Sequence, residues 1–314
     1  MTDWKTTGID KDAFMRYVEQ QIYTLPGVDD PRACFTVLLT GSRARGVHAD
    51  ASDVDIDVLC PDAVYRAVHR ESLAAGIIES PDSFGVVTAP ECGWEAYFGA
   101  SRGRPHFSVT SLADVHRHIA TCTDPWLWVW LNARVIVDPD RQFQRIRSTF
   151  DGYPHDVLVK KVKYHWLLAG YWSICVTPLH DTSDDSALAA STAILNTVTE
   201  LLKLCFLLDG KPLPYAGKLM AMVDSTTLGR QFKPMFQRGV DLVLGRAAHT
   251  DSFCDRVARA FAMFNDSQGC QECQQFEAAF FAKMAEIGVP PDWLKADFKN
   301  IDDLLLGRLG PAPE

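Results

Sequence analysis

The first half of the chain alternates short apolar runs with helical patterns. An apolar run over residues 35–40 and an alternating run over residues 53–60 predict β-strands. Further strand-like runs lie at residues 84–88, 93–98, 106–110 and 134–137. Helical spacing predicts helices over residues 10–24, 61–76 and from 111 onward. Trp126, Trp128 and Trp130 alternate as if on a strand or an extended edge, and we expect them to pack in the core or between domains.

Beyond residue 153 the pattern changes to long helical segments without strand signals. We expect these helices at about residues 155–176, 186–208, 216–223, 230–245 and 250–287, with a short one near 291–306. The pattern therefore predicts an α+β fold, in which a small mixed-sheet domain over residues 1–150 precedes a helical bundle over residues 151–306. The Gly- and Pro-containing tail, residues 307–314, should fray.

The alternating run carries an unusual set of charges. Asp53, Asp55 and Asp57 fall on one face of the predicted strand, because successive side chains of a strand point to opposite faces. Three like charges on one face of a core strand repel each other and resist burial. Divalent cations would relieve this repulsion, and two metal ions can act together in phosphoryl displacement. We therefore expect a two-metal Mg²⁺ site at these three residues.

A turn just before this strand supplies a second chemical feature. Gly41 and Ser42 follow the apolar run directly and are expected at the start of a short helix. Backbone N–H groups at such a turn can hold phosphate oxygens. A phosphate-binding turn next to metal-binding carboxylates indicates nucleotide chemistry.

These residues resemble a known family. The motif Gly41-Ser42-x-Ala-Arg-Gly, followed by Ser-Asp53-x-Asp55, resembles the polymerase-β-type nucleotidyltransferase superfamily, particularly its minimal and its antibiotic (aminoglycoside and lincosamide) branches. The resemblance implies that Gly41 and Ser42 bind the β- and γ-phosphates of a nucleoside triphosphate and that Asp53 and Asp55 hold Mg²⁺. It is a motif-level match over about residues 35–60, and the plan of a sheet domain followed by helices is also shared.

The family's usual third acid is missing from the corresponding strand. His106, Ser108 and Thr110 share a face there, and no carboxylate lies among them. His106 could act as general base, since imidazole has a suitable pKa range. Asp57 or Glu95 could instead supply the missing acid. A half-exposed strand histidine without a catalytic role remains the alternative.

Four further residues are candidates for nucleotide contacts. Arg43 and Arg45 lie in the phosphate turn, where a guanidinium could bind the triphosphate or pyrophosphate, or could instead pair with an acid or with solvent. Asn196 and Lys218 match a stretch of aminoglycoside adenylyltransferases whose asparagine and lysine reach the nucleotide. A surface lysine on a short helix is the alternative for Lys218.

Composition narrows the possible partners. The formal net charge is −9, with no run of five or six basic residues, so nucleic acid is a disfavoured partner. No stretch of about 18 consecutive apolar residues and no signal-peptide pattern is present, so we expect no membrane association. Nine irregularly spaced cysteines suit reduced thiols in the cytoplasm.

Together these features predict a magnesium-dependent nucleotidyltransferase of the EC 2.7.7 type. We expect it to transfer a nucleoside monophosphate from a triphosphate donor to a hydroxyl of a small acceptor molecule. The expected donor is ATP. Two alternatives stay open. One is attachment of AMP to a protein, as in toxin–antitoxin pairs, and the other is a catalytically impaired nucleotide-binding protein.

Overall fold

The computed structural model describes residues 4–77, 86–87, 95–98, 105–175, 184–246, 252, 255–257, 259–260 and 271–289. Its contacts divide the chain into two compact units, Met1–Asp151 and Gly152–Glu314. Each unit has its own hydrophobic core, so each is described by itself. The helix expected near residues 291–306 and the tail 307–314 lie outside the described residues.

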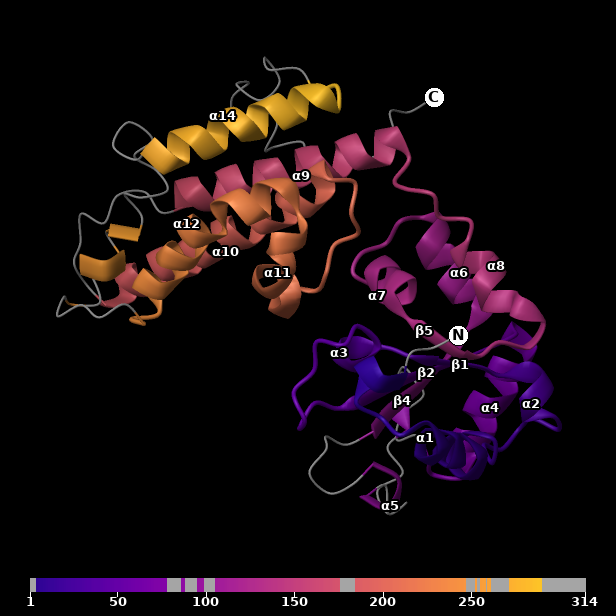
Figure 1. The fold of residues 1–314 in the computed structure, drawn as a ribbon. Coiled ribbons are helices and arrows are strands. Elements are labelled where there is room, and N and C mark those ends of the chain that lie inside the picture. Colours follow the sequence, from indigo (N-terminus) through magenta and orange to yellow (C-terminus); the bar gives the residue numbers. More distant parts are fainter. Residues whose placement is uncertain are drawn as a thin grey trace. The chain divides into compact units, whose positions relative to one another are not determined.

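The first unit contains a five-stranded mixed sheet in the order β3-β4-β2-β1-β5. Figure 1 labels four of these strands, β1, β2, β4 and β5. Its strands are β1 Thr36–Leu39, β2 Val54–Cys60, β3 Val86–Val87, β4 Pro105–Ser111 and β5 Arg134–Val137. β1 is antiparallel to β2 and β5, β3 is antiparallel to β4, and β2 runs parallel to β4. The strands expected at residues 35–40, 53–60, 106–110 and 134–137 are thus confirmed, and so is the α+β class.

The helices of this unit cover the sheet and connect its strands. They are η1 Trp4–Thr7, α1 Lys11–Tyr17, the π-helix η2 Val18–Ile22, α2 Pro31–Cys34, α3 Gly41–Ala44, α4 Asp62–Ala74, α5 Glu95–Phe98, α6 Leu112–Ala120, α7 Trp126–Asn132, η3 Pro139–Arg141 and α8 Gln142–Arg147. α4 lies in the crossover that two parallel strands require. Phe14 and Val18 are fully buried against the apolar face of β1 and β2, where Val37 and Val58 are also fully buried.

Two sequence predictions in this unit were wrong. Residues 93–98 were expected as a strand, but Glu95–Phe98 forms helix α5, whose Phe98 packs against Tyr17 with ring centroids 5.2 Å apart. The alternating tryptophans were expected on an extended segment, but they lie on helix α7. Trp126 and Trp130 stack one helical turn apart, at a centroid distance of 6.1 Å.

The second unit is helical in its described part. Its helices are α9 His155–Cys175, α10 Asp184–Leu208, α11 Ala216–Met222, η4 Val223–Ser225, α12 Thr227–Val243 and α14 Gln271–Glu286. α10 packs against both α9 and α12, and α12 also contacts α14 (Figure 1). Within α10, the segment Leu188–Leu208 is long and apolar enough to cross a membrane on length and composition alone, but 67% of the window is buried. That burial is typical of the core helix of a bundle.

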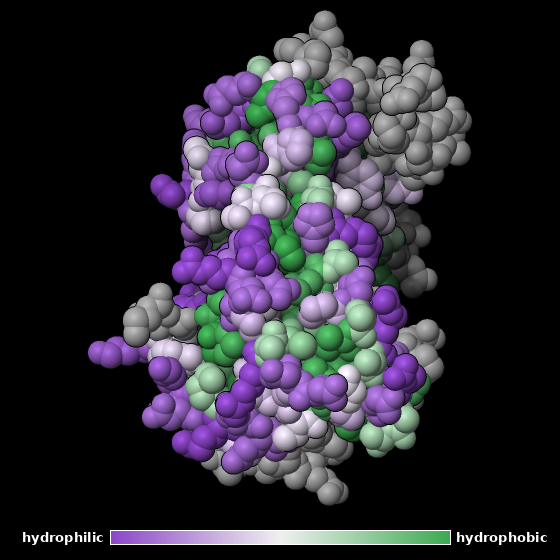
Figure 2. Space-filling view, turned by 90° about the vertical axis from the view of Figure 1, so that its right-hand side faces the viewer, coloured by the Kyte–Doolittle hydropathy of each residue, from purple (hydrophilic) through white to green (hydrophobic). Residues whose placement is uncertain are grey.

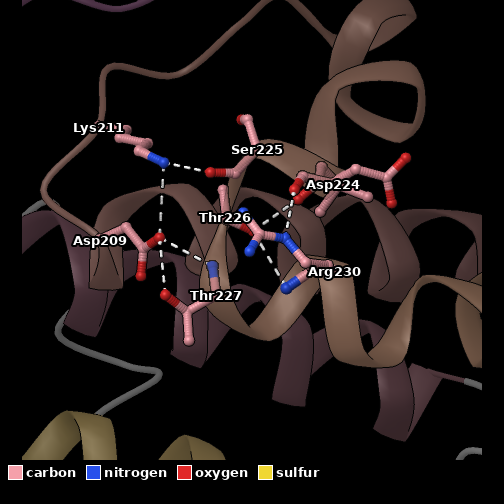
Figure 3. Close-up of polar contacts among 9 residues, drawn as sticks. Asp209, Lys211, Asp224, Ser225, Thr226, Thr227 and Arg230 are labelled. Atoms are coloured by element: carbon pink, nitrogen blue, oxygen red, sulfur yellow. Dashed lines mark hydrogen bonds and ion pairs between the residues drawn. The ribbon is translucent and has the colours of Figure 1, made fainter.

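A network of polar contacts joins the C-terminal end of α10 to the start of α12 (Figure 3). Asp209 Oδ2 accepts hydrogen bonds from the Thr227 amide at 2.8 Å and the Thr227 hydroxyl at 3.2 Å, at the start of α12. Lys211 lies between the Asp209 carboxylate, 3.6 Å away, and the carbonyl of Ser225. Helix N-termini leave amides without partners inside the helix, so Asp209 stabilises the first turn of α12.

Hydrophilic side chains dominate the face drawn in Figure 2, with hydrophobic side chains exposed in patches between them. Among the residues that the structure describes, the most exposed large apolar side chains are Val47 and Leu188, each 63% exposed. Both are single residues rather than parts of a described apolar cluster.

Candidate functional site

The three aspartates lie at the start of β2 as the alternation predicts. Asp53 directly precedes the strand and is exposed, whereas Asp55 and Asp57 are partly buried. The intervening Val54 and Ile56 are buried in the core. The three acids therefore lie on the face of β2 opposite the core, just before the strand and in its N-terminal half.

Gly41 brings the preceding turn into contact with these acids. The residue begins α3 with a φ of +65°, a conformation that favours glycine. A Cβ atom at this position would lie 1.8 Å from Asp55 Oδ2 and 2.7 Å from Asp55 Cγ. The adjacent Thr40 amide donates to the Asp55 carbonyl at 2.9 Å, which fixes the turn to the strand. Only glycine allows the backbone to approach the carboxylate this closely.

The first turn of α3 presents backbone amides beside the acids. Its N-cap residue, Thr40, makes no side-chain capping bond. Within the described part of the chain, no acceptor is found for the amides of Gly41 and Ser42. Helix-start amides of this kind suit phosphate oxygens.

Arg43 bonds through its side chain to the protein backbone, whereas the sequence suggested a phosphate, an acidic side chain or solvent as its partner. Its side chain is 1% exposed, and its guanidinium donates to backbone carbonyls. The acceptors are the carbonyl oxygens of Thr7, Asp50, Ser52 and Asp53, at 2.7 to 3.3 Å. A guanidinium this deeply buried does not point toward a phosphate. Arg43 instead ties η1 and the loop before β2 together, and so holds the backbone of Asp53.

Arg45 also lies against protein groups. Its Nε donates to the Gly41 carbonyl at 3.0 Å, and its guanidinium carbon lies 4.3 Å from the centre of the Trp128 ring. The cation–π contact joins α3 to α7. Arg45 therefore stabilises the turn from its C-terminal side. Its partner Trp128 lies on helix α7 and not on the extended segment that the sequence suggested.

The neighbouring strand β4 adds polar groups to the same face. In the parallel register His106 pairs with Asp55, and Ser108 pairs with Asp57. His106 Nε2 lies 3.9 Å from Asp53 Oδ2, and both side chains are well exposed. The Ser108 hydroxyl donates to Asp57 Oδ1 at 2.5 Å. The sequence had placed Ser108 on the His106 face without assigning it a role, because the register between β2 and β4 is not readable from local patterns.

Asp57 is held in a less polar setting than its neighbours. Burial raises the pKa of its carboxyl above the ordinary value. Hydrogen bonds from Ser108 and Thr40 oppose this shift, and the nearby Asp55 charge adds to it. With one oxygen bonded to Ser108, Asp57 is a weaker metal-ligand candidate than Asp53 or Asp55.

A magnesium ion requires oxygen donors, which the aspartates of β2 carry. Among the described residues, no group of three or more His, Cys, Asp or Glu side chains forms a ready-made metal site. Mg²⁺ is commonly held by one or two carboxylates together with substrate phosphates. Asp53 and Asp55 beside the amides of α3 fit that mode, because the Gly41 backbone leaves space next to Asp55 that a side chain would fill.

Three other candidates lie on separate elements. Glu95 is exposed on helix α5, which packs against α1, and is not on a strand beside β4 as expected. Asn196 and Lys218 belong to the helical unit, on α10 and α11, and both are partly buried. A Cβ atom on Gly217, directly before Lys218, would meet nothing within 4 Å.

Comparisons with known proteins give matches of two kinds, to a family model and to solved structures. Residues 121–218 match the model of a domain of unknown function, DUF4037, which is less than half of the chain. No curated protein matches. Among solved structures, the chain is similar to a nucleotidyltransferase-like protein from Exiguobacterium sibiricum, with 12% sequence identity and a TM-score of 0.43. The alignment covers 95% of this chain and 88% of that one.

Proposed function

We propose that the protein is a magnesium-dependent nucleotidyltransferase that moves a nucleoside monophosphate, AMP by preference, from a triphosphate donor to a hydroxyl of a small acceptor. The observation that supports this most is the contact between Gly41 and the Asp55 carboxylate. The start of α3 lies next to Asp55, which supports the proposal that one triphosphate contacts both.

Each residue of this cluster has a proposed task. The amides of Gly41 and Ser42 bind the β- and γ-phosphates, and Asp53 and Asp55 are the Mg²⁺ ligands, with Asp57 behind them. When bound, magnesium would neutralise the phosphates and stabilise the attacking and leaving oxygens. Arg43 keeps the loop before β2 in position, so that Asp53 stays beside His106.

The acceptor hydroxyl must lose a proton as it attacks the α-phosphorus. His106 is the proposed base, because its imidazole lies within the acid cluster and is exposed to an incoming acceptor. Asn196 and Lys218 are proposed to contact the nucleotide, a role that comes from the resemblance alone.

The test is transfer of label from α-labelled ATP and Mg²⁺ to a panel of hydroxyl-bearing small molecules and to lysate proteins. The double variant Asp53→Asn/Asp55→Asn should lose at least about 100-fold in rate while keeping its melting temperature. Asp50→Asn is the matched control, since its exposed side chain lies in the same loop but not on the strand. Transfer that the double variant leaves unchanged would refute the mechanism.

One observation favours a second candidate function. Strand β4, Pro105–Ser111, carries no carboxylate, so a protein that binds nucleotide without turning it over is also consistent with the cluster. Calorimetry with Mg-ATP and a pyrophosphate-release assay separate the two functions. Binding without pyrophosphate release on any acceptor favours this second function, whereas label on protein bands indicates protein AMPylation.

A further inference from the structure

A second candidate site lies in the first unit and shares none of the residues above. It is a cavity of about 990 Å³ lined by residues of η1, α1, β5, η3 and α8. This volume lies at the upper end of the range typical of ligand pockets. The strand β5 is at the end of the described sheet, with β1 as its neighbour.

The cavity is basic in a chain that is acidic overall. Four cationic side chains line it, Lys11, Arg134, Arg141 and Arg147, against one carboxylate, Asp138. The formal net charge of the whole chain is −9. A concentration of positive charge in a concave, partly apolar site attracts anions and raises their local concentration.

The single carboxylate is already engaged in the fold. Asp138 Oδ1 accepts from the Thr36 hydroxyl at 3.0 Å and from the Phe143 amide at 3.1 Å. Its Oδ2 accepts from the Gln144 amide at 3.0 Å, at the start of α8. Asp138 therefore caps α8 and bonds to β1, and among the described residues it forms no ion pair with the four cations.

Two of the cations are held in place, and two are exposed without ion pairs. Arg147 donates to the Ala133 carbonyl at 3.0 Å and lies 5.3 Å from the Phe143 ring centre. Arg134 donates to the Ala44 carbonyl. In the described part of the chain, Lys11 and Arg141 are exposed and enter no ion pair or side-chain hydrogen bond.

Apolar side chains line the cavity as well. Trp4 and Met15 line the cavity, and the Trp4 ring lies 5.4 Å from Phe14, a core residue. The indole is thus backed by the core on one side and accessible on the other. Such a lining suits the flat or apolar part of a ligand.

We propose that this cavity binds a small organic anion that carries a phosphate or carboxylate group next to an aromatic or apolar group. The acidic group lies among Lys11, Arg141 and Arg147, whose donors match the oxygens of phosphate and carboxylate. The apolar group packs on Trp4 and Met15. This binding requires neither Mg²⁺ nor the acids of β2.

Calorimetry on the full chain without Mg²⁺ tests the proposal, with phenyl phosphate as the probe. Benzoate replaces the phosphate by a carboxylate, inorganic phosphate supplies the charge alone, and benzyl alcohol supplies the ring alone. We expect one bound phenyl phosphate per chain, binding of inorganic phosphate at least about tenfold weaker, and no measurable binding of benzyl alcohol. Comparison with benzoate shows which acid group is preferred.

Variants locate the bound probe. Lys11→Gln/Arg141→Gln should weaken phenyl phosphate binding roughly tenfold, because each exposed charge pair contributes up to about fivefold. Arg145→Gln is the matched control, an exposed arginine of α8 that does not line the cavity. Melting temperatures verify that both variants fold. No binding of phenyl phosphate, equal binding of inorganic phosphate, or equal affinity in the double variant and the control would overturn the proposal.

Discussion

Two carboxylates that lose contact with water, the buried Glu200 and the partly buried Asp57, have opposite shifts in pKa. Glu200, in the helical unit, accepts from His165 Nδ1 at 2.5 Å and from Lys203 Nζ at 2.7 Å. Burial alone would raise the pKa of Glu200, but these partners outweigh it and lower the pKa. Asp57, on the sheet, has the hydroxyl groups of Ser108 and Thr40 as its partners among the described residues, and its pKa is raised.

The same contrast holds for the other acids of the two units. In the helical unit Asp209 has Lys211 and the start of α12 as partners. On the sheet, neither Asp53 nor Asp57 forms an ion pair with a lysine or arginine among the described residues. Carboxylates that the fold neutralises have a structural role. Asp53 and Asp57, which have no lysine or arginine partner among the described residues, are instead suited to a cation brought by a ligand.

The largest expected effect comes from removing the Arg43 side chain, which holds η1 and the loop before β2 together. Arg43→Ala removes the guanidinium donors of one buried and several partly buried carbonyl bonds, so the free energy of unfolding should fall by at least about 3 kcal/mol. The loop that holds Asp53 would also loosen, and nucleotidyl transfer should be lost. Urea unfolding measures the first effect. A variant as stable as the wild type would contradict this structural role of Arg43.

Gly41→Ala tests the close contact between the turn and the strand. The added Cβ would overlap the Asp55 carboxylate, so we expect a loss of about 2–4 kcal/mol in stability and of most activity. Gly76→Ala is the matched control. Gly76 has a φ of +68° but nothing within 4 Å of its added Cβ, so only the backbone strain, about 1 kcal/mol, applies. Equal losses in the two variants would mean that the contact with Asp55 is unimportant.

Glu200→Gln tests how much the charge of Glu200, paired with His165 and Lys203, contributes to stability. The variant removes the charge that His165 and Lys203 share, and should cost about 2 kcal/mol at pH 7. Because the pKa of Glu200 is lowered in the folded state, its contribution is present above the ordinary carboxyl pKa and is lost as the pH falls through the folded value. The wild-type and variant melting temperatures should therefore converge in acid.

Asp57→Asn should give a smaller effect of the opposite sign. A raised pKa means that the ionised Asp57 destabilises the fold above its folded-state pKa, so the neutral amide should stabilise the protein by about 1 kcal/mol or less at pH 7. Thermal unfolding without Mg²⁺ measures it. Destabilisation by this variant would remove the contrast with Glu200.

Local patterns were sufficient to predict β2, its alternating acids and the turn at Gly41. Strand alternation and glycine conformations are decided by neighbouring residues, so these features are readable from the sequence. The burial of Arg43 could not be predicted from the sequence. Its acceptors include the backbone carbonyls of Thr7 and Asp50, and every residue type has a backbone carbonyl.

The errors at α5 and α7 have a related cause. Both segments are short and rich in aromatic residues, which favour strands by local propensity. Their tertiary partners, Tyr17 for Phe98 and Arg45 for Trp128, stabilise a helical turn instead. Packing between distant segments overrides weak local preference.

The hydrogen bond from Arg134 to Ala44 joins a residue of the basic cavity to the last residue of α3. If occupation of the cavity shifts Arg134, the equilibrium position of α3 shifts with it. Thermodynamic reciprocity then requires that a nucleotide at one end of this connection alter the affinity for the organic anion at the other by the same factor.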